Sequence, residues 1–144
     1  MSVVIDTNLL IYAVHASAPQ HELARNYIES QRQQGGFCVT WSILYEWLRV
    51  VTHPRVFSRP LSPAIARSFV LDLADDPRVD ILRHTPNHAR FLKEVLDMAP
   101  PLRGNLLHDA HIAAAMREHG IHTIATADQH FRLFPFLQIV NPLG

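Results

Sequence analysis

Short apolar runs alternate with longer stretches of helical periodicity, and this alternation constrains the fold more than any other feature of the chain. Strands separated by helices can pair in parallel, with helices covering both faces of the sheet. The sequence therefore predicts an α/β fold with a mainly parallel sheet. The expected strands span residues 2–5, 37–40, 79–82, 122–125 and 137–140, and the longer helices span residues 19–34, 43–51, 63–73, 86–98 and 105–118.

Length and composition agree with a globular protein. The chain has 144 residues, of which 48% are apolar, so we expect a single domain over residues 1–144 with a real core. Its one cysteine, Cys38, lies in an apolar run and should be a buried thiol. No segment is typical of a targeting or membrane-spanning sequence, and we expect a cytoplasmic protein.

Four acidic residues fall at positions where parallel sheets place their chemistry. Asp6 directly follows the first strand, and Asp128 follows the strand over residues 122–125. Glu46 and Asp109 each lie one turn into a helix, among apolar neighbours. Because ligands bind at the carboxyl ends of the strands in such sheets, these four side chains are expected to converge. The remaining acids, Glu118 among them, are expected on solvated surfaces.

Convergence of four carboxylates restricts the chemistry. Two carboxylates about 4 Å apart repel by roughly 4 kcal/mol at an effective dielectric constant near 20, so such a cluster needs counter-charge. Mg²⁺ and Mn²⁺ prefer oxygen ligands and can activate water for phosphodiester hydrolysis. Taken singly, each acid also has an ordinary explanation: Asp6 and Asp128 could cap helices, while Glu46 and Asp109 could pair with Arg49 or Arg103.

Four segments of the chain resemble the acidic motifs of PIN domains. Their order, spacing and total length are similar to those of the small VapC toxins of bacterial toxin–antitoxin pairs. The segments are Val3–Ala13, Ser42–Val50, Leu107–Ala114 and Thr126–Phe131.

The resemblance implies a three-layer α/β/α sandwich with the activity of a Mg²⁺- or Mn²⁺-dependent endoribonuclease. It also implies a homodimer that is inhibited by a VapB-like antitoxin. The carboxylates that would hold the metal and act in catalysis are Asp6, Glu46, Asp109 and Asp128. The residues that would orient those carboxylates are Thr7, Asn8 and Thr126.

The fourth motif departs from the family pattern. Many relatives carry a second aspartate where this chain has His130. Two alternatives follow. Either Asp128 alone supplies the fourth acid of the site, which we favour, or His130 joins the metal or faces the RNA. Arg49 and Arg103 are further candidate RNA contacts, although solvated surface arginines explain them equally well.

Other kinds of function are supported less well by the sequence. Among ten histidines, His108 and His111 share one helical face, which allows a histidine-based zinc site. A non-catalytic PIN-like scaffold that binds RNA or a partner is disfavoured by the intact acids. A phosphatase-like hydrolase would need an aspartate where Asn8 stands, and no Gly-x-Ser-x-Gly nucleophile motif is present. The aromatic residues Trp41, Tyr45 and Trp47 could form a partner-binding face or part of the core.

Overall fold

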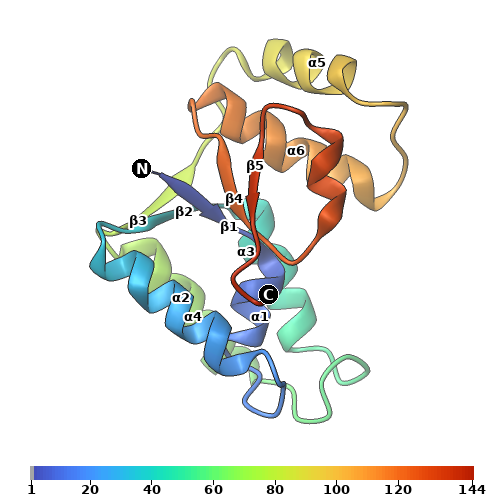
Figure 1. Ribbon diagram of the computed structural model, residues 1–144. Helices are drawn as coiled ribbons and strands as arrows, with labels where there is room; N and C mark the ends of the chain where they lie inside the picture. The colour runs from blue at the N-terminus through green and yellow to red at the C-terminus, as the bar shows by residue number, and fades with distance from the viewer. Residues whose placement is uncertain (1) are drawn as a thin grey trace.

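The computed structural model of the protein describes residues 2–144. Five strands form one sheet in the order β3-β2-β1-β4-β5, and all four strand pairings are parallel (Figure 1). The predicted parallel α/β architecture is thus confirmed. The strands are β1 (Val3–Ile5), β2 (Phe37–Thr40), β3 (Val79–Leu82), β4 (Thr123–Ala125) and β5 (Gln138–Val140).

Six α-helices and one 3₁₀-helix connect the strands of the described chain. Local signals account for their starts: the Thr40 hydroxyl accepts from the Ile43 backbone N–H, and the Ser62 hydroxyl caps the next helix ahead of Pro63. The helices are α1 (Thr7–Tyr12), α2 (His21–Gln33), α3 (Trp41–Val51), α4 (Pro63–Asp75), α5 (His88–Met98), α6 (Asn105–Glu118) and η1 (Gln129–Leu133).

The strand order determines the layers. Steps from β1 to β2 to β3 run in one direction across the sheet, so right-handed crossovers place α1 to α4 on one face. The next step returns past β1 to β4, which places α5 and α6 on the opposite face, as Figure 1 shows. The direction reverses between β1 and β4, and open α/β sheets bind ligands at such switch points.

The core fills the space between these layers. All residues of β1, β2 and β4 are buried, as expected for a sheet covered on both faces. Trp47 is completely buried, where its indole N–H donates to the Leu10 carbonyl at 3.0 Å. Trp47 therefore belongs to the core, whereas Trp41 and Tyr45 are exposed.

Two further expectations are tested by the fold. Cys38 is buried, and burial raises the pKa of its thiol to about 11, which leaves it protonated and unsuited to nucleophilic catalysis. In the part of the chain described, no helix has the length and apolar character needed to cross a bilayer.

Candidate active site

All four predicted acids line one pocket of about 560 Å³ at the carboxyl ends of β1 and β4. Asp6 and Asp128 enter from the strand ends, while Glu46 and Asp109 enter from α3 and α6. The lining residues are Asp6, Thr7, Asn8, Ile11, Glu46, Arg49, Asn105, His108, Asp109, Asp128 and His130. Elements from both helical layers thus meet around one group of carboxylates.

Asp6 is held rigidly at the end of β1. Its carboxylate accepts from the Thr7 backbone N–H and from the Thr126 hydroxyl, each at 2.7 Å, and it also caps α1. Thr126 therefore orients Asp6 through its side chain, as expected. Thr7 does so through its backbone only, since its buried hydroxyl has no hydrogen-bond partner within residues 2–144.

A small network joins the ends of β1 and β4. Asn8 donates to the Thr126 hydroxyl at 3.0 Å and accepts from the Ala127 backbone N–H at 3.3 Å. The Thr126 hydroxyl also accepts from the Asp128 backbone N–H at 2.9 Å. Through these contacts the position of Asp6 is linked to that of Asp128.

The two buried acids resist ionisation in the protein alone. Burial raises the pKa of Asp109 to about 7, assisted by the nearby charges of Asp128 and Asp6. Burial also raises the pKa of Asp6, although the hydrogen bonds from Thr126 and Thr7 oppose the shift. A pocket that disfavours its own negative charges would gain from a bound cation.

His130 lies at the edge of this acidic group. Its backbone N–H donates to Asp128 at 2.8 Å, and its ring Nδ1 lies 3.1 Å from the same carboxylate oxygen. One potential metal-binding atom from each of Asp109, Asp128 and His130 lies within 4.8 Å of the others. The unexpected histidine of the fourth motif therefore faces the pocket.

Glu46 has a different environment from the other acids. Arg49 binds its carboxylate with two hydrogen bonds, of 2.6 and 3.1 Å, and this lowers the pKa of Glu46. Arg49 thus lines the pocket as the partner of Glu46. Arg103 is exposed and is not among the lining residues, so the two candidate RNA contacts occupy different surroundings.

The two histidines suggested as a zinc-binding pair do not line the same site. His108 lines the acidic pocket, whereas His111 contacts His84 and lies outside it. Asn105 and His108 also line the pocket, although neither was among the predicted residues of the acidic site. The spacing offered a signal for Asn105, since it precedes Asp109 by one helical turn.

Glu118 was wrongly expected on the surface. Its side chain is fully buried and accepts from the Thr85 hydroxyl at 2.8 Å and from the Thr85 backbone N–H at 3.1 Å. The buried carboxylate needs these donors because it has lost its contact with water.

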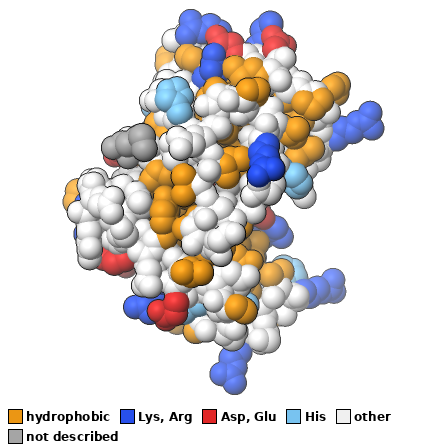
Figure 2. Space-filling model, in the orientation of Figure 1, with side chains coloured by type: hydrophobic (Ala, Val, Ile, Leu, Met, Phe, Trp, Pro, Cys, Tyr) orange, Lys and Arg blue, Asp and Glu red, His pale blue; other side chains and the backbone are white. Residues whose placement is uncertain are grey.

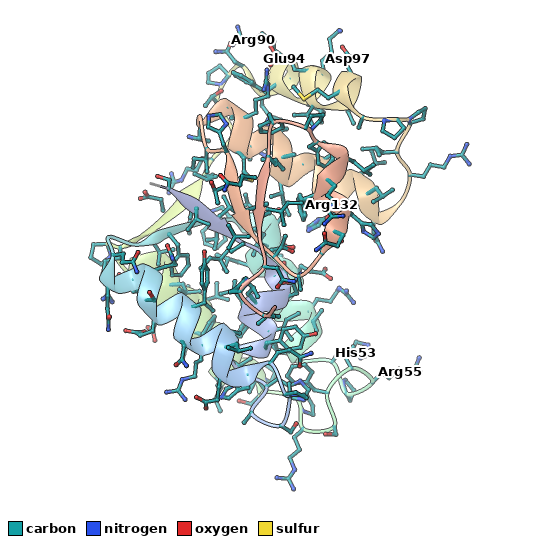
Figure 3. All side chains as sticks on the ribbon, viewed as in Figure 1. His53, Arg55, Arg90, Glu94, Asp97 and Arg132 are labelled. Carbon is teal, nitrogen blue, oxygen red and sulfur yellow. The ribbon has the colours of Figure 1, made fainter. Side chains whose placement is uncertain are left out.

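Basic side chains surround the molecule more widely than they line the pocket. Figure 2 shows Lys and Arg side chains projecting at the upper and lower ends of the molecule. Arg55, on the loop after α3, projects outward at the lower right of Figure 3, and Arg132, on η1, is also exposed. These arginines are exposed and free to meet an anionic chain.

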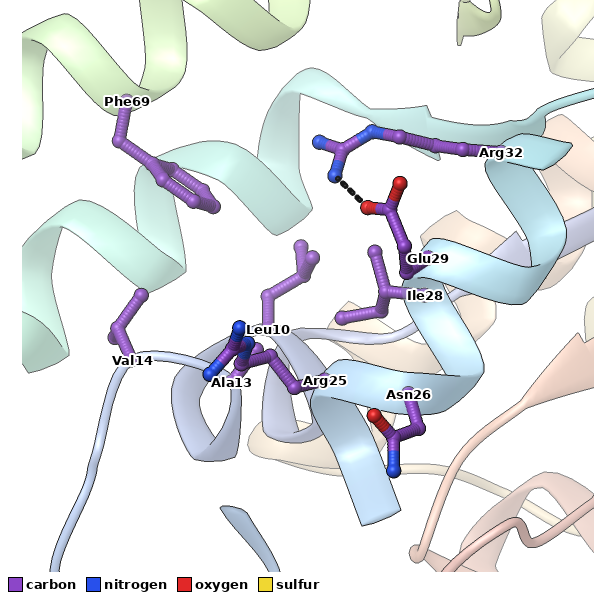
Figure 4. A pocket seen from close by; sticks show the side chains of 9 residues that line it. All are labelled: Leu10, Ala13, Val14, Arg25, Asn26, Ile28, Glu29, Arg32 and Phe69. Carbon is purple, nitrogen blue, oxygen red and sulfur yellow. Dashed lines mark hydrogen bonds and ion pairs between the residues drawn. The ribbon is translucent and has the colours of Figure 1, made fainter. Parts of the chain in front are cut away.

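A second cavity, of about 330 Å³, lies among α1, α2 and α4 (Figure 4). Leu10, Ile28 and Phe69 form its apolar part, while Arg32 at its rim pairs with Glu29 at 3.3 Å. It has no group of acids comparable to that of the first pocket, so it offers no hydrolytic chemistry of its own.

The amino-acid sequence matches the PIN domain family over residues 3–137. The chain belongs to the PIN domain family. It is 34% identical to Ribonuclease VapC48 of Mycobacterium tuberculosis (strain CDC 1551 / Oshkosh), covering 100% of this chain and 99% of that protein. Ribonuclease VapC33 of the same strain is 30% identical, with 98% of each chain covered.

Solved structures agree with this assignment at the level of the fold. VapBC2 from Rickettsia felis, bound to a DNA fragment from its promoter, superposes with a TM-score of 0.69 at 19% identity, covering 98% of each chain. The sarcin-ricin loop cleaving toxin VapC20 of Mycobacterium tuberculosis gives a TM-score of 0.66 at 19% identity, covering 90% of this chain and 92% of that one. The PIN-like three-layer sandwich is therefore confirmed.

Proposed function

We propose that the protein is a metal-dependent endoribonuclease, the toxin component of a VapBC-type toxin–antitoxin pair, which hydrolyses RNA phosphodiester bonds. The observation that carries the proposal is the lining of one pocket by Asp6, Glu46, Asp109 and Asp128. The names of the curated relatives, ribonucleases VapC48 and VapC33, support the substrate class. Both names specify RNA as the substrate.

The donor set fits Mg²⁺, with Mn²⁺ as the alternative. Carboxylate oxygens are the ligands that both ions prefer, and burial, together with the neighbouring carboxylates, raises the pKa values of Asp6 and Asp109, which a bound cation would offset. When bound, such an ion supplies an activated water and neutralises charge on the phosphate. Asp6, Asp109 and Asp128 would hold it, with Glu46 completing the acidic wall.

The remaining residues of the pocket position these acids and the RNA. Thr126, Asn8 and the Thr7 backbone hold the acids at the two strand ends. Arg49 fixes the carboxylate of Glu46 and presents an exposed guanidinium to a phosphate. His130 is a second candidate RNA contact, and it could instead join the metal; Arg103 would contact RNA outside the pocket.

The partners follow from the same family assignment. We expect a VapB-like antitoxin that inhibits the toxin, a homodimer, and action in the cytoplasm, where RNA substrates occur. The Rickettsia felis structure contains VapBC2 on promoter DNA, and FitAcB from Neisseria gonorrhoeae has a similar fold. Isolation of the chain together with the product of an adjacent antitoxin reading frame would test the partnership.

Cleavage of RNA by the purified chain tests the proposal directly. We expect cleavage with Mg²⁺ or Mn²⁺, its loss in EDTA, and a fall of roughly 100-fold or more in rate for Asp6→Asn and for Asp109→Asn. Asp72→Asn is the matched control, because Asp72 is exposed on α4, outside the pocket.

A different result would identify the alternative. Binding of RNA without cleavage, unchanged by metal or by either asparagine variant, would favour the non-catalytic PIN-like scaffold. Cleavage that persists in EDTA would contradict the metal-dependent mechanism.

A further inference from the structure

Three histidines form a cluster outside the acidic pocket. His84 follows β3, His88 begins α5, and His111 lies on α6. One ring nitrogen from each lies within 4.8 Å of the other two. None of the three lines the pocket of the four acids, so the proposed nuclease function leaves this cluster unexplained.

The contacts within the cluster are close. The Nε2 atoms of His84 and His111 are 2.7 Å apart, and the rings of His84 and His88 stack with their centres 3.8 Å apart. At 2.7 Å the two nitrogens must share a proton, because two facing lone pairs repel each other. Because each imidazole lone pair lies in the plane of its ring, a metal ion bound by all three nitrogens would require His84 to turn out of its stack on His88.

Neighbouring groups already orient two of the imidazoles. His88 Nδ1 lies 2.7 Å from Glu118, whose buried carboxylate also binds Thr85. Since an ionised carboxylate can only accept, Nδ1 of His88 donates this hydrogen bond, and in the neutral ring Nε2 would be the nitrogen with the lone pair. A carboxylate behind a histidine is the arrangement that metal sites commonly use to fix the ligand.

The third imidazole is oriented by a hydroxyl group. Nδ1 of His111 lies 3.2 Å from the Ser42 hydroxyl at the start of α3. Its Nε2 consequently points at His84, and the hydroxyl, rather than a second metal ligand, occupies the other side of the ring. Two of the three candidate ligands therefore have a polar partner on the nitrogen that faces away from the cluster.

We propose that His84, His88 and His111 form a second metal site, suited to a borderline transition ion such as Zn²⁺. Three imidazoles with an open fourth position are a known zinc ligand set, and imidazole favours Zn²⁺ over Mg²⁺. Bonds of about 2.1 Å in a tetrahedral site place ligand nitrogens roughly 3.4 Å apart, so His84 must move slightly from His111. His84 is exposed, so its ring would turn toward solvent as it leaves its contacts with His88 and His111.

Such an ion would fasten α5 to the body of the protein. Val95 is the one buried residue of α5. A 2.8 Å ion pair also joins Glu94 of α5 (labelled in Figure 3) to Arg117 of α6. A metal bound by His88 and His111 adds a direct link between the first residue of α5 and the middle of α6. The site would thus stabilise the outermost helix without entering the acidic pocket.

Zinc titration of the full chain tests the site. The Asp6→Asn/Asp109→Asn double variant serves as the background, so that the acidic pocket contributes no binding, and a chromophoric chelator competes for Zn²⁺ in excess Mg²⁺. We expect one equivalent of Zn²⁺, lost by roughly 100-fold or more in affinity in His84→Ala, and weakened roughly 10- to 100-fold by Glu118→Gln. His122→Gln, which removes an exposed histidine elsewhere, should bind as the background does.

Hydrogen exchange provides a second readout that does not depend on activity. Zn²⁺ should increase amide protection over residues 83–99 in the background protein and leave it unchanged in His84→Ala. Equal zinc binding by the background and His84→Ala, or equal losses in His84→Ala and His122→Gln, would overturn the proposal. Because the acidic pocket is disabled throughout, these outcomes are independent of the nuclease assay.

Discussion

Asp6 and Asp109 line the same pocket but depend on different neighbours. Asp6 is fixed by hydrogen bonds from Thr7 and Thr126, which partly compensate its burial. The pKa of Asp109 is governed by burial and by the charges of Asp128 and Asp6, with a small opposing effect from His130. The charge of Asp109 consequently depends on a bound cation, because its pKa lies at about 7 in the protein alone.

This difference predicts how the pH affects the stability of the metal-free protein. Because the pKa of Asp109 is raised to about 7, the folded state retains a proton that the unfolded state releases near its usual value of 3.8. Stability should therefore fall as the pH rises from about 4 to 7. Asp109→Asn should remove this loss and raise the free energy of unfolding by roughly 1–3 kcal/mol at pH 8.

Urea unfolding in EDTA at pH 4 and pH 8 measures this effect. The variant and the original chain should differ much less at pH 4, where folded Asp109 keeps its proton and unfolded Asp109, close to its usual pKa of 3.8, is still partly protonated. An equal difference at the two pH values would show that ionisation of Asp109 is not the cause.

Thr126 is expected to matter through position and not through chemistry. Its hydroxyl donates to Asp6 and accepts from Asn8 and the Asp128 backbone, so Thr126→Val removes one hydrogen bond from each of these three groups. We expect a loss of about 1–3 kcal/mol in stability and roughly 10- to 100-fold in Mn²⁺ affinity. Thr126→Ser keeps the hydroxyl and should restore metal affinity, which a purely packing role for the methyl group would not explain.

At the level of helices and strands, the sequence predicts types well and boundaries within two residues. Helix α3 begins at Trp41, two residues before the predicted start, because Thr40 ends β2 and caps the helix at once. The convergence of Asp6, Glu46, Asp109 and Asp128 on one pocket was also predictable, since strand ends share one edge of a parallel sheet.

Helix α6 shows why the rest was not predictable. It is covered by the sheet on one side and by α5 on the other, so Ala113 to Met116 are buried without a break. Where a helix is buried on every side, the periodicity of its apolar residues cannot show which side faces the sheet and which side faces another helix. The division of His108 and His111 between two sites, and the burial of Glu118, therefore depended on where α5 lies.

The turn between α2 and β2 offers a test of backbone packing. A Cβ on Gly36 would lie 1.8 Å from the Arg78 carbonyl oxygen, and its φ is +110°, whereas Gly35, with φ +114°, has open space. We expect Gly35→Ala to cost about 1–2 kcal/mol, from conformation alone, and Gly36→Ala about 3 kcal/mol or more. Chemical denaturation of the two variants measures the difference; equal costs would contradict the close approach.

For the whole molecule, zero formal charge conceals an uneven distribution. The chain has 13 basic and 13 acidic residues. Four acids line one pocket, so the rest of the surface has a basic excess, as Figure 2 suggests at its two ends. A chain that held a cation in its pocket, as proposed, and bound RNA on its surface would need no net positive charge overall.

Binding of Mg²⁺ or Mn²⁺ should accordingly stabilise the whole fold. A ligand at 100 times its dissociation constant adds about 2.7 kcal/mol to the free energy of unfolding. We expect a higher melting temperature with MgCl₂ than with NaCl at equal ionic strength, and no such increase in the Asp6→Asn/Asp109→Asn variant. Stabilisation of both proteins alike would point to binding elsewhere.

The pairing of β1 with β4 has a consequence for the order of events during synthesis. The central strand β1 is made before its two neighbours, one of which comes from residues 123–125, and Thr126 reaches back to Asp6 across 120 positions. Contacts of such long sequence separation form late and slowly. A nascent chain that has not yet emerged as far as residues 126–130 has no complete pocket, so the ribosome that makes this protein is not exposed to the assembled site before those residues have been released.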